Sequence, residues 1–362
     1  MENNPSIFSG RLTKFRAKLR EKDIDGALIT KRENYIYLSG FIGTSAFLVI
    51  TQEAAVLITD FRYVEQASSQ APDYEVIKYQ GSILTAINDV LKSKGVDRLG
   101  FEESYTTYDK YKEYKAKLEV RELNPLQGMA ENLRIIKDEQ EIGIIKTAVK
   151  IADGAFQHVL GVIRPGMTES EVAAELEYYM KKQGAKGASF ETIVASGERA
   201  SMPHGVASEK VIQTGDVITL DYGAIYKEYC SDMTRTIFLG KPSEDLKKIY
   251  NIVLEAQQRA EEKAVAGLKG KEIDAVARNV IAGHGYGDYF GHGLGHGVGL
   301  EIHEEPRLSM MGDLVMEDGM VVTVEPGIYV NGLGGVRIED MVVIHGDQPM
   351  ILTQSTKEMI II

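Results

Sequence analysis

The first 130 residues alternate short apolar runs with amphipathic segments. Apolar side chains recur at helical spacing from Ile7 to Leu19 with Lys and Arg between them, which predicts a helix that covers a domain core rather than a membrane. After this helix the pattern predicts strands in alternation with helices, which is typical of a small α/β domain. The strands are expected over 25–30, 45–51 and 54–59, and the helices over 61–70, 82–94 and 107–118.

The pattern loosens in LNPLQGMAEN, residues 123–132, before a long helical stretch begins near Asp138. We therefore expect a domain boundary near residue 130, with an α/β domain over 1–130 and a second domain over 131–362. The length of 362 residues agrees with this division, because one core usually serves about 100 to 200 residues.

The second domain contains two blocks of the same order, each with two helices followed by a β-rich segment. The first block predicts helices over 138–163 and up to 184, with the β segment over 216–239; the second predicts helices over 243–265 and up to 282, with the β segment over 320–345. Thr168 and Glu171 have the spacing of a capping box. The offset between blocks is too long for a solenoid repeat, so we infer a duplicated unit whose halves leave a cleft between their sheets.

Composition and charge exclude several classes of function. With 41 Lys and Arg against 53 Asp and Glu the chain carries a formal charge of −12 and shows no basic stripe, so nucleic acid is not an expected partner. Cys230 is the single cysteine, which excludes an intramolecular disulfide or a multi-thiolate metal site. The sequence shows neither a signal-peptide pattern nor a run of about 18 apolar residues, so we expect a cytoplasmic protein without membrane contact.

The first β segment, VITLDYGAIYKEYCSDMTRTIFLG, carries two acidic residues on either side of a predicted hairpin. A turn centred on Tyr226 and Lys227 would place Asp221 directly opposite Asp232. Two facing carboxylates destabilise a sheet unless a cation lies between them. For this pair alone a solvated hairpin is the better explanation, because Asp is usually a surface residue.

The second β segment, VVTVEPGIYVNGLGGVRIEDMVVI, repeats the arrangement, with Glu325 and Glu339 flanking a Gly-rich turn around Gly332. Acidic pairs at equivalent positions of two apolar hairpins are expected to be buried, and buried carboxylates need cations. The repetition therefore favours a metal site formed by both halves.

Three histidines, His292, His296 and His303, lie between the acidic pairs in GHGLGHGVGLEIHEEP. One imidazole beside four carboxylates gives an oxygen-rich ligand set, which suits two divalent ions such as Mn²⁺, with Co²⁺, Fe²⁺ or Zn²⁺ as substitutes. Two ions that share a bridging water activate it for attack, so the set predicts hydrolysis at a carbonyl or phosphoryl centre.

Together, LDYGA, SDMTRT, HGLGHGVGLEIHEEP, TVEPGIY and VRIED resemble the motifs of the M24 metallopeptidase superfamily, which includes methionine aminopeptidase and aminopeptidase P and has the pita-bread fold. DFRYVEQA over 60–67 and LRIIKDEQEI over 133–142 are similar to the N-terminal domain and linker of its Xaa-Pro subgroup. The resemblance implies an α/β domain of the creatinase/prolidase type, serving substrate access and oligomerisation, followed by an α+β pita-bread catalytic domain built from a duplicated helix-helix-hairpin block.

The resemblance also implies a role for each candidate residue. Asp232 and Glu339 would bridge the two ions, Glu325 would act as general base, and His303 would hydrogen-bond the substrate and its oxyanion. His204, in SMPHG, would lie near the leaving group. The full ligand set implied is Asp221, Asp232, His296, Glu325 and Glu339, and the substrate-binding residues implied are His292, Arg337 and Tyr329. Structural roles are expected for Cys230, His158, His284 and His345.

Three activities share this ligand set. Methionine aminopeptidases normally lack the α/β domain, which leaves two Xaa-Pro peptidases that act on proline-containing peptides. The resemblance favours Xaa-Pro aminopeptidase, which releases the residue before proline; the alternative is Xaa-Pro dipeptidase (prolidase), which cleaves only the dipeptide. A metal-free pita-bread binding module is more distant, because all five ligands are present. The resemblance also implies that the protein forms a homodimer.

Overall fold

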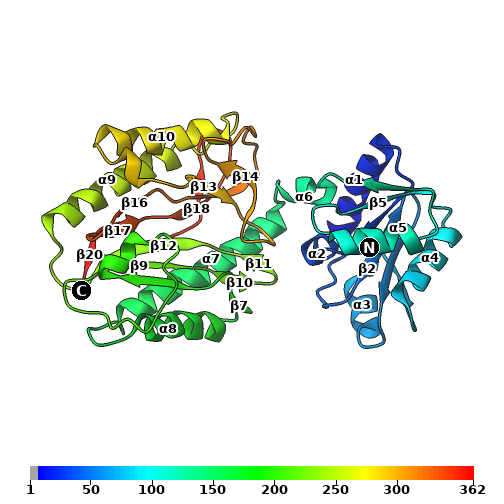
Figure 1. Ribbon diagram of the computed structural model, residues 1–362, viewed down its shortest axis with the longest axis horizontal. Coiled ribbons are helices and arrows are strands. Elements are labelled where there is room, and N and C mark those ends of the chain that lie inside the picture. The colour runs from blue at the N-terminus through cyan, green and yellow to red at the C-terminus, as the bar shows by residue number, and fades with distance from the viewer. Residues whose placement is uncertain (1–6) are drawn as a thin grey trace, which may run out of the picture. The chain divides into compact units, whose positions relative to one another are not determined.

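The structure is a computed structural model that describes residues 7–362. The chain divides into two compact units between Arg134 and Ile135 (Figure 1). Among the described residues, none of the helices combines the length and the apolar character that crossing a membrane requires.

The N-terminal unit is a six-stranded sheet with helices. Its strands are β1 (Gly26–Ile29), β2 (Phe47–Thr51), β3 (Ala55–Thr59), β4 (Glu75–Lys78), β5 (Arg98–Phe101) and β6 (Glu122–Pro125), in the order β4-β3-β2-β1-β5-β6. Only β2 runs antiparallel to its neighbours. The helices are α1 (Ile7–Glu21), α2 (Arg32–Ser39), α3 (Val64–Gln70), α4 (Ile83–Ser93), α5 (Tyr108–Lys117) and α6 (Met129–Arg134). As predicted, α1 buries Leu12, Phe15 and Leu19 against the core.

The C-terminal unit contains both predicted blocks. The first comprises α7 (Glu139–Leu160), α8 (Glu169–Lys182), β7 (Gly187–Ala188), β8 (Ile193–Ser196), the 3₁₀ helix η1 (Gly197–Ser201), β9 (Val217–Tyr222), β10 (Ala224–Tyr226), β11 (Tyr229–Cys230) and β12 (Met233–Phe238). The capping box of Thr168 and Glu171 at the start of α8 is confirmed, and Asp138 and Glu141 form another at α7.

The second block repeats this order. It comprises α9 (Glu244–Glu261), α10 (Gly270–Gly283), η2 (Gly287–Tyr289), β13 (Gly295–Gly297), β14 (Glu304–Leu308), β15 (Val321–Val324), β16 (Gly327–Val330), β17 (Gly334–Arg337), β18 (Asp340–Val343), β19 (Met350–Ile351) and β20 (Ile360–Ile361). Each block buries its own apolar core, one beneath α7 and α8 and the other beneath α9 and α10. In Figure 1 these helix pairs lie on opposite sides of the strands.

Strand β12 joins the two blocks. Glu339 donates its backbone N–H to the Thr234 carbonyl at 3.1 Å. The Arg235 guanidinium, which is fully buried, donates to the carbonyls of Thr234 and Glu339 and to those of Ser355 and Thr356. These bonds hold the strand that follows Asp232 against the segment that carries Glu339.

A buried charged cluster lies behind this junction. Asp340 is paired with Arg235 at 2.6 Å and with the Lys357 ammonium at 2.7 Å. Lys357 also lies 2.6 Å from Glu261 at the end of α9. Burial, reinforced by the charge of Asp340, raises the pKa of Glu261 from its ordinary 4.5 to about 7.

The raised pKa of Glu261 predicts a pH-dependent stability. Between pH 4.5 and 7 the folded state retains a proton that the unfolded chain has lost, so the contribution of Glu261 to stability falls as the pH rises through this window and is then constant. Glu261→Gln removes this dependence. The melting temperature of the variant minus that of the wild type should therefore increase by roughly 3 °C or more between pH 5 and pH 8. The exposed neighbour Glu262 provides the control Glu262→Gln, and a difference for Glu261→Gln that is constant with pH would contradict the assignment.

Candidate metal centre

The first acidic pair lies on a hairpin whose register differs from the predicted one. Asp221 on β9 pairs with Thr234 on β12, and the two turn residues are Lys227 and Glu228. The prediction that Asp221 lies directly opposite Asp232 is therefore wrong. Both turn residues adopt positive φ, 46° and 71°, the conformation that two-residue hairpin turns favour, and the turn lies one residue later than expected. The resulting register shift of two residues keeps side chains on the same face, and both carboxylates line one cavity.

The second acidic pair has the expected arrangement. Strand β15 pairs with β18 and β16 pairs with β17 in one continuous register, and Glu325 and Glu339 are opposite one another in the break between these ladders. The turn at Gly332 has φ of 77°, a conformation that glycine adopts without strain.

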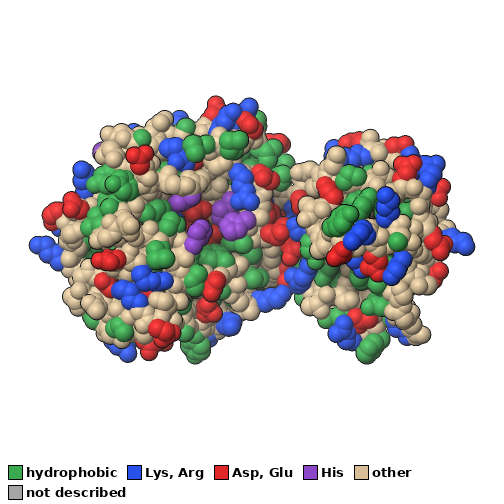
Figure 2. Space-filling model, viewed as in Figure 1, with side chains coloured by type: hydrophobic (Ala, Val, Ile, Leu, Met, Phe, Trp, Pro, Cys, Tyr) green, Lys and Arg blue, Asp and Glu red, His purple; other side chains and the backbone are tan. Residues whose placement is uncertain are grey.

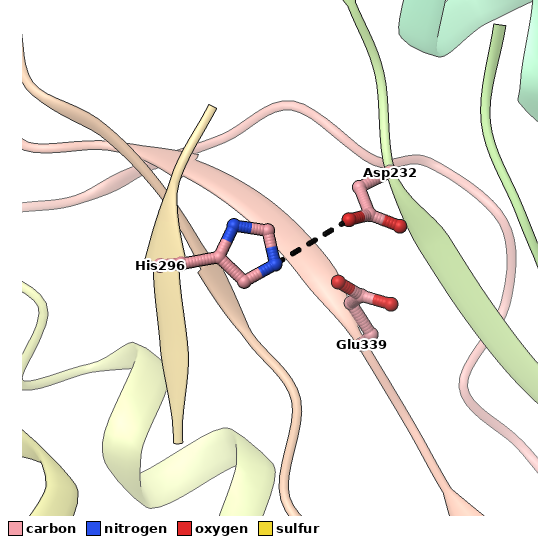
Figure 3. Close-up of side chains that lie close together, drawn as sticks. All are labelled: Asp232, His296 and Glu339. Atoms are coloured by element: carbon pink, nitrogen blue, oxygen red, sulfur yellow. Dashed lines mark ion pairs between the residues drawn. The ribbon is translucent and has the colours of Figure 1, made fainter. Parts of the chain in front are cut away.

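His296, on β13, brings an imidazole to these carboxylates. Asp232, His296 and Glu339 each offer one ligand atom, and these atoms lie within 4.8 Å of one another. Figure 3 shows the three side chains pointing toward a common point. His296 Nε2 is 3.6 Å from Asp232 Oδ2 and 3.3 Å from Glu325 Oε1.

The unsatisfied carboxylate oxygens of this group fit divalent cations. Asp221 Oδ1, Asp232 Oδ1 and Glu339 Oε1 are buried and accept no hydrogen bond from any described residue. Burial and the neighbouring negative charges raise the pKa values of Asp232 and Glu339 well above their ordinary range. A buried, unpaired carboxylate is costly, and a bound cation removes the cost by supplying both charge and coordination. An oxygen-rich set with one imidazole suits hard or borderline divalent ions.

Glu325 differs from the other carboxylates because it is already ionised. Although burial opposes ionisation, the hydrogen bond and charge of His296 lower the pKa of Glu325 to about 2. Its Oε1 also accepts a hydrogen bond from Thr323 Oγ1 at 3.0 Å. Glu325 is therefore the carboxylate of this group whose charged form is best stabilised by its neighbours.

The carboxylates line a cavity of about 470 Å³ between the two blocks, where a cleft was predicted. His204, His292 and His303 also line it, and Figure 2 shows histidine side chains gathered on one face of this unit. The apolar part of its wall is formed by Phe190, Ile193, Pro203, Val206 and Ile302. The cavity thus places an apolar surface next to a group of titratable side chains.

A chain of hydrogen bonds runs behind the cavity wall. Arg337 donates to Asp221 Oδ2 at 2.5 Å, to Thr234 Oγ1 at 3.1 Å and to the Tyr329 hydroxyl at 2.8 Å. The Tyr329 oxygen lies 2.9 Å from His292 Nε2. Of the expected substrate-binding residues, His292 and Arg337 line the cavity, whereas Tyr329 is not among its described lining residues. Tyr329 instead connects these two side chains.

Arg307 lines the cavity but was not predicted as a site residue. It lies on β14 directly opposite His296 on β13, and its side chain is 47% exposed. Cross-strand partners project from the same face of a sheet. The strand-like alternation of EEPRL, with Arg307 two positions after Glu305, was the signal that could have identified it. Arg337 is engaged with Asp221, so Arg307 is the cation more accessible to a ligand.

The histidines that were expected to be structural do not line this cavity. His158 lies 2.8 Å from Glu175, and His284 lies 3.4 Å from Glu255. His345 is exposed, and Cys230 is buried.

Comparison with known proteins gives two family matches. Residues 143–346 match "Metallopeptidase family M24", and residues 11–136 match "Creatinase/Prolidase N-terminal domain". The Xaa-Pro dipeptidase from Bacillus anthracis is 51% identical, with a TM-score of 0.96 over 98% of this chain and 100% of that one. The X-Pro aminopeptidase from Thermotoga maritima is 40% identical, with a TM-score of 0.90 over 96% of this chain and all of that one.

A further relative is the Xaa-Pro dipeptidase of Pyrococcus horikoshii, which is 42% identical over 98% of this chain and 99% of its own length. These matches confirm the predicted combination of a creatinase/prolidase-type N-terminal domain with a pita-bread domain. The chain therefore belongs to metallopeptidase family M24 and, within it, to the Xaa-Pro peptidases.

Proposed function

We propose that this protein is an Xaa-Pro dipeptidase that hydrolyses the bond before proline with two divalent metal ions, for which Mn²⁺ is our first choice. Asp221, Asp232, His296, Glu325 and Glu339 would hold the ions. The relatives named as Xaa-Pro dipeptidases support this activity better than the aminopeptidase first expected from the sequence.

The proposal of a dipeptidase rests mainly on the position of Arg307, which lines the cavity. A dipeptidase must recognise the free carboxylate of proline, and a guanidinium binds a carboxylate through two parallel hydrogen bonds. Among residues 7–362, the ion-pair neighbour of Arg307 is Glu305, whose Oε1 lies 3.9 Å from the Arg307 Nε, and Arg307 lines the same cavity as the carboxylates. The apolar wall at Ile193 and Val206 suits the proline ring.

The side chains of the cavity have complementary tasks. When bound, the metal ions would supply a water of lowered pKa and polarise the scissile carbonyl. Glu325, being ionised, would accept a proton from the attacking water. Partial burial and the neighbouring His296 lower the pKa of His303, which keeps its imidazole neutral and able to donate one hydrogen bond to the developing oxyanion. His204 would hold the leaving proline nitrogen.

The proposal can be tested by measuring the hydrolysis of an Xaa-Pro dipeptide and an Xaa-Pro-Yaa tripeptide in parallel, with Mn²⁺ present. We expect Gly-Pro to be cleaved with a much higher kcat/KM than Gly-Pro-Gly, and activity to be lost after exhaustive chelation. Arg307→Met should raise the KM for Gly-Pro by roughly 10- to 100-fold with little change in kcat, because a hydrogen bond to a charged group contributes about 1.5 to 3 kcal/mol.

Arg259 on α9 lies outside the cavity lining, so Arg259→Met is a matched control that should leave KM unchanged. Efficient cleavage of the tripeptide, with Arg307→Met affecting both substrates equally, would favour the aminopeptidase, the activity named for the Thermotoga maritima relative. Full activity without divalent ions would refute both the dipeptidase and the aminopeptidase, because each is proposed to depend on metal ions.

A further inference from the structure

One buried carboxylate holds the segment that carries His204. Glu169 is the first residue of α8, and its side chain is fully buried. Its Oε1 accepts hydrogen bonds from the backbone N–H and the hydroxyl of Ser196, both at 2.8 Å. Its Oε2 accepts from the backbone N–H and the hydroxyl of Ser208, at 3.2 and 2.6 Å, and pairs with Arg199. Five donors therefore converge on one carboxylate.

These donors lie at both ends of the segment over 196–208 and at Arg199 within it. Ser196 is the last residue of β8, and Ser208 is the last residue of the segment. Arg199, in η1, also donates to the Val206 carbonyl at 2.9 Å. Glu169 thus closes the segment into a loop and, through Arg199, fixes its inner part.

The His204 imidazole depends on this backbone for its position. The side chain is exposed to the cavity, and among residues 7–362 it has no hydrogen-bond or ion-pair partner. Its neighbours are fixed by backbone contacts: Gly205 donates to the Met202 carbonyl at 3.0 Å, and Val206 to that of His204 at 2.9 Å. A Cβ at Gly205 would lie 2.8 Å from the Ala195 Cβ, so the segment packs closely on β8.

Helix capping does not account for Glu169. Thr168 and Glu171 already satisfy the start of α8 through their capping box. A buried carboxylate is costly unless it is fully hydrogen-bonded, and all of the donors described here belong to the segment that carries His204. We propose that Glu169 is a positioning residue that aims His204 into the cavity. The role of His204 in this inference rests on the proposed function.

Glu169→Gln keeps the shape of the side chain but removes its charge and two acceptor sites. We expect kcat/KM for Gly-Pro to fall by about 10- to 100-fold, the loss expected when a site group is displaced by about 1 Å. Glu171→Gln, two residues further along α8, is the matched control and should leave kcat/KM within about twofold, because the side-chain hydrogen bond of Glu171 in the described part of the chain is that of the capping box, which a glutamine can also form.

A double-mutant cycle distinguishes positioning from general destabilisation. If Glu169 acts through His204, Glu169→Gln should lower kcat/KM by less than about threefold in a His204→Ala background. If Glu169→Gln lowered kcat/KM by the same factor in the wild-type and His204→Ala backgrounds, the inference would be overturned.

A second readout does not depend on activity. In metal-free protein labelled with ¹³C at histidine Cε1, the chain has only seven histidine signals, and His204→Ala identifies one of them. Glu169→Gln should shift or broaden the His204 signal and leave that of His158 unchanged. If Glu169→Gln does not fold, Ser208→Ala, which removes one donor without unpairing a charge, should produce a smaller change in the same signal.

An unchanged His204 signal in a folded variant would overturn the inference. If the wild type cleaves neither Gly-Pro nor Gly-Pro-Gly, the proposed function fails, whereas the NMR measurement still decides whether Glu169 positions His204.

Discussion

Glu339→Gln should abolish hydrolysis, with kcat/KM reduced by roughly 10³-fold or more. The variant removes one of the carboxylates proposed to hold the ions, and the charge stabilisation that a metal centre supplies amounts to several kcal/mol. Glu339 Oε1 is one of the buried oxygens that lack a partner in the described chain, and Oε2 accepts from Thr234 Oγ1 at 2.6 Å. An amide would retain contact with Thr234 and lose the negative charge.

Metal content measured by elemental analysis should fall together with activity. The fold should be retained, because burial disfavours the ionised Glu339, and metal-free Glu339→Gln should melt at or above the temperature of the metal-free wild type. Glu317→Gln, at an exposed position before β15, is the control and should retain both metal and activity. Near-normal turnover in Glu339→Gln would refute its assignment as a metal ligand.

His303→Ala should reduce kcat by about 10²-fold or more while the metal content stays normal. The ring of His303 lies 4.4 Å from that of His296, edge to face, and it lines the cavity without being one of the proposed ligands. Loss of a single hydrogen-bond donor to an oxyanion typically costs a factor of this size. The effect should appear mainly in kcat, because the bond is made most strongly in the transition state.

His345→Ala is the matched control, since His345 is exposed and does not line the cavity. A rise in KM alone for His303→Ala would indicate that His303 binds the ground state. Loss of metal would indicate that it is a ligand.

The sequence predicted those parts of the fold that have strong periodicity. The long helices α7 to α10 and the apolar strands β1, β2, β3, β9 and β12 lie where their patterns placed them. The pattern did not reveal β4 and β6, because each is a four-residue strand without a fully buried position. It also missed α2, whose side chains are buried almost all round and so show no amphipathic stripe.

Within the site, residue identity was easier to predict than geometry. The acidic pairs were conspicuous because Asp and Glu interrupt strands of Val and Ile, yet the register of the first pair depended on whether Lys227 and Glu228 adopt positive φ, which neither residue favours. Arg307 escaped notice because an arginine that follows two glutamates and a proline resembles a solvated surface. Glu169 escaped notice because an acidic residue at a helix start is ordinary, and its five donors come from positions 27 to 39 residues away.

The hydrogen bonds of Arg235 have a consequence for the order of events during synthesis. This guanidinium is translated more than a hundred residues before the Ser355 and Thr356 carbonyls that it binds, and Asp232 precedes Glu339 by a similar distance. A nascent chain that has not reached these positions therefore holds unpaired charges with nothing to bury them against. The proposed ligands of the first block can meet those of the second only after residue 339 has left the ribosome, so a metal centre of this kind would form late in synthesis.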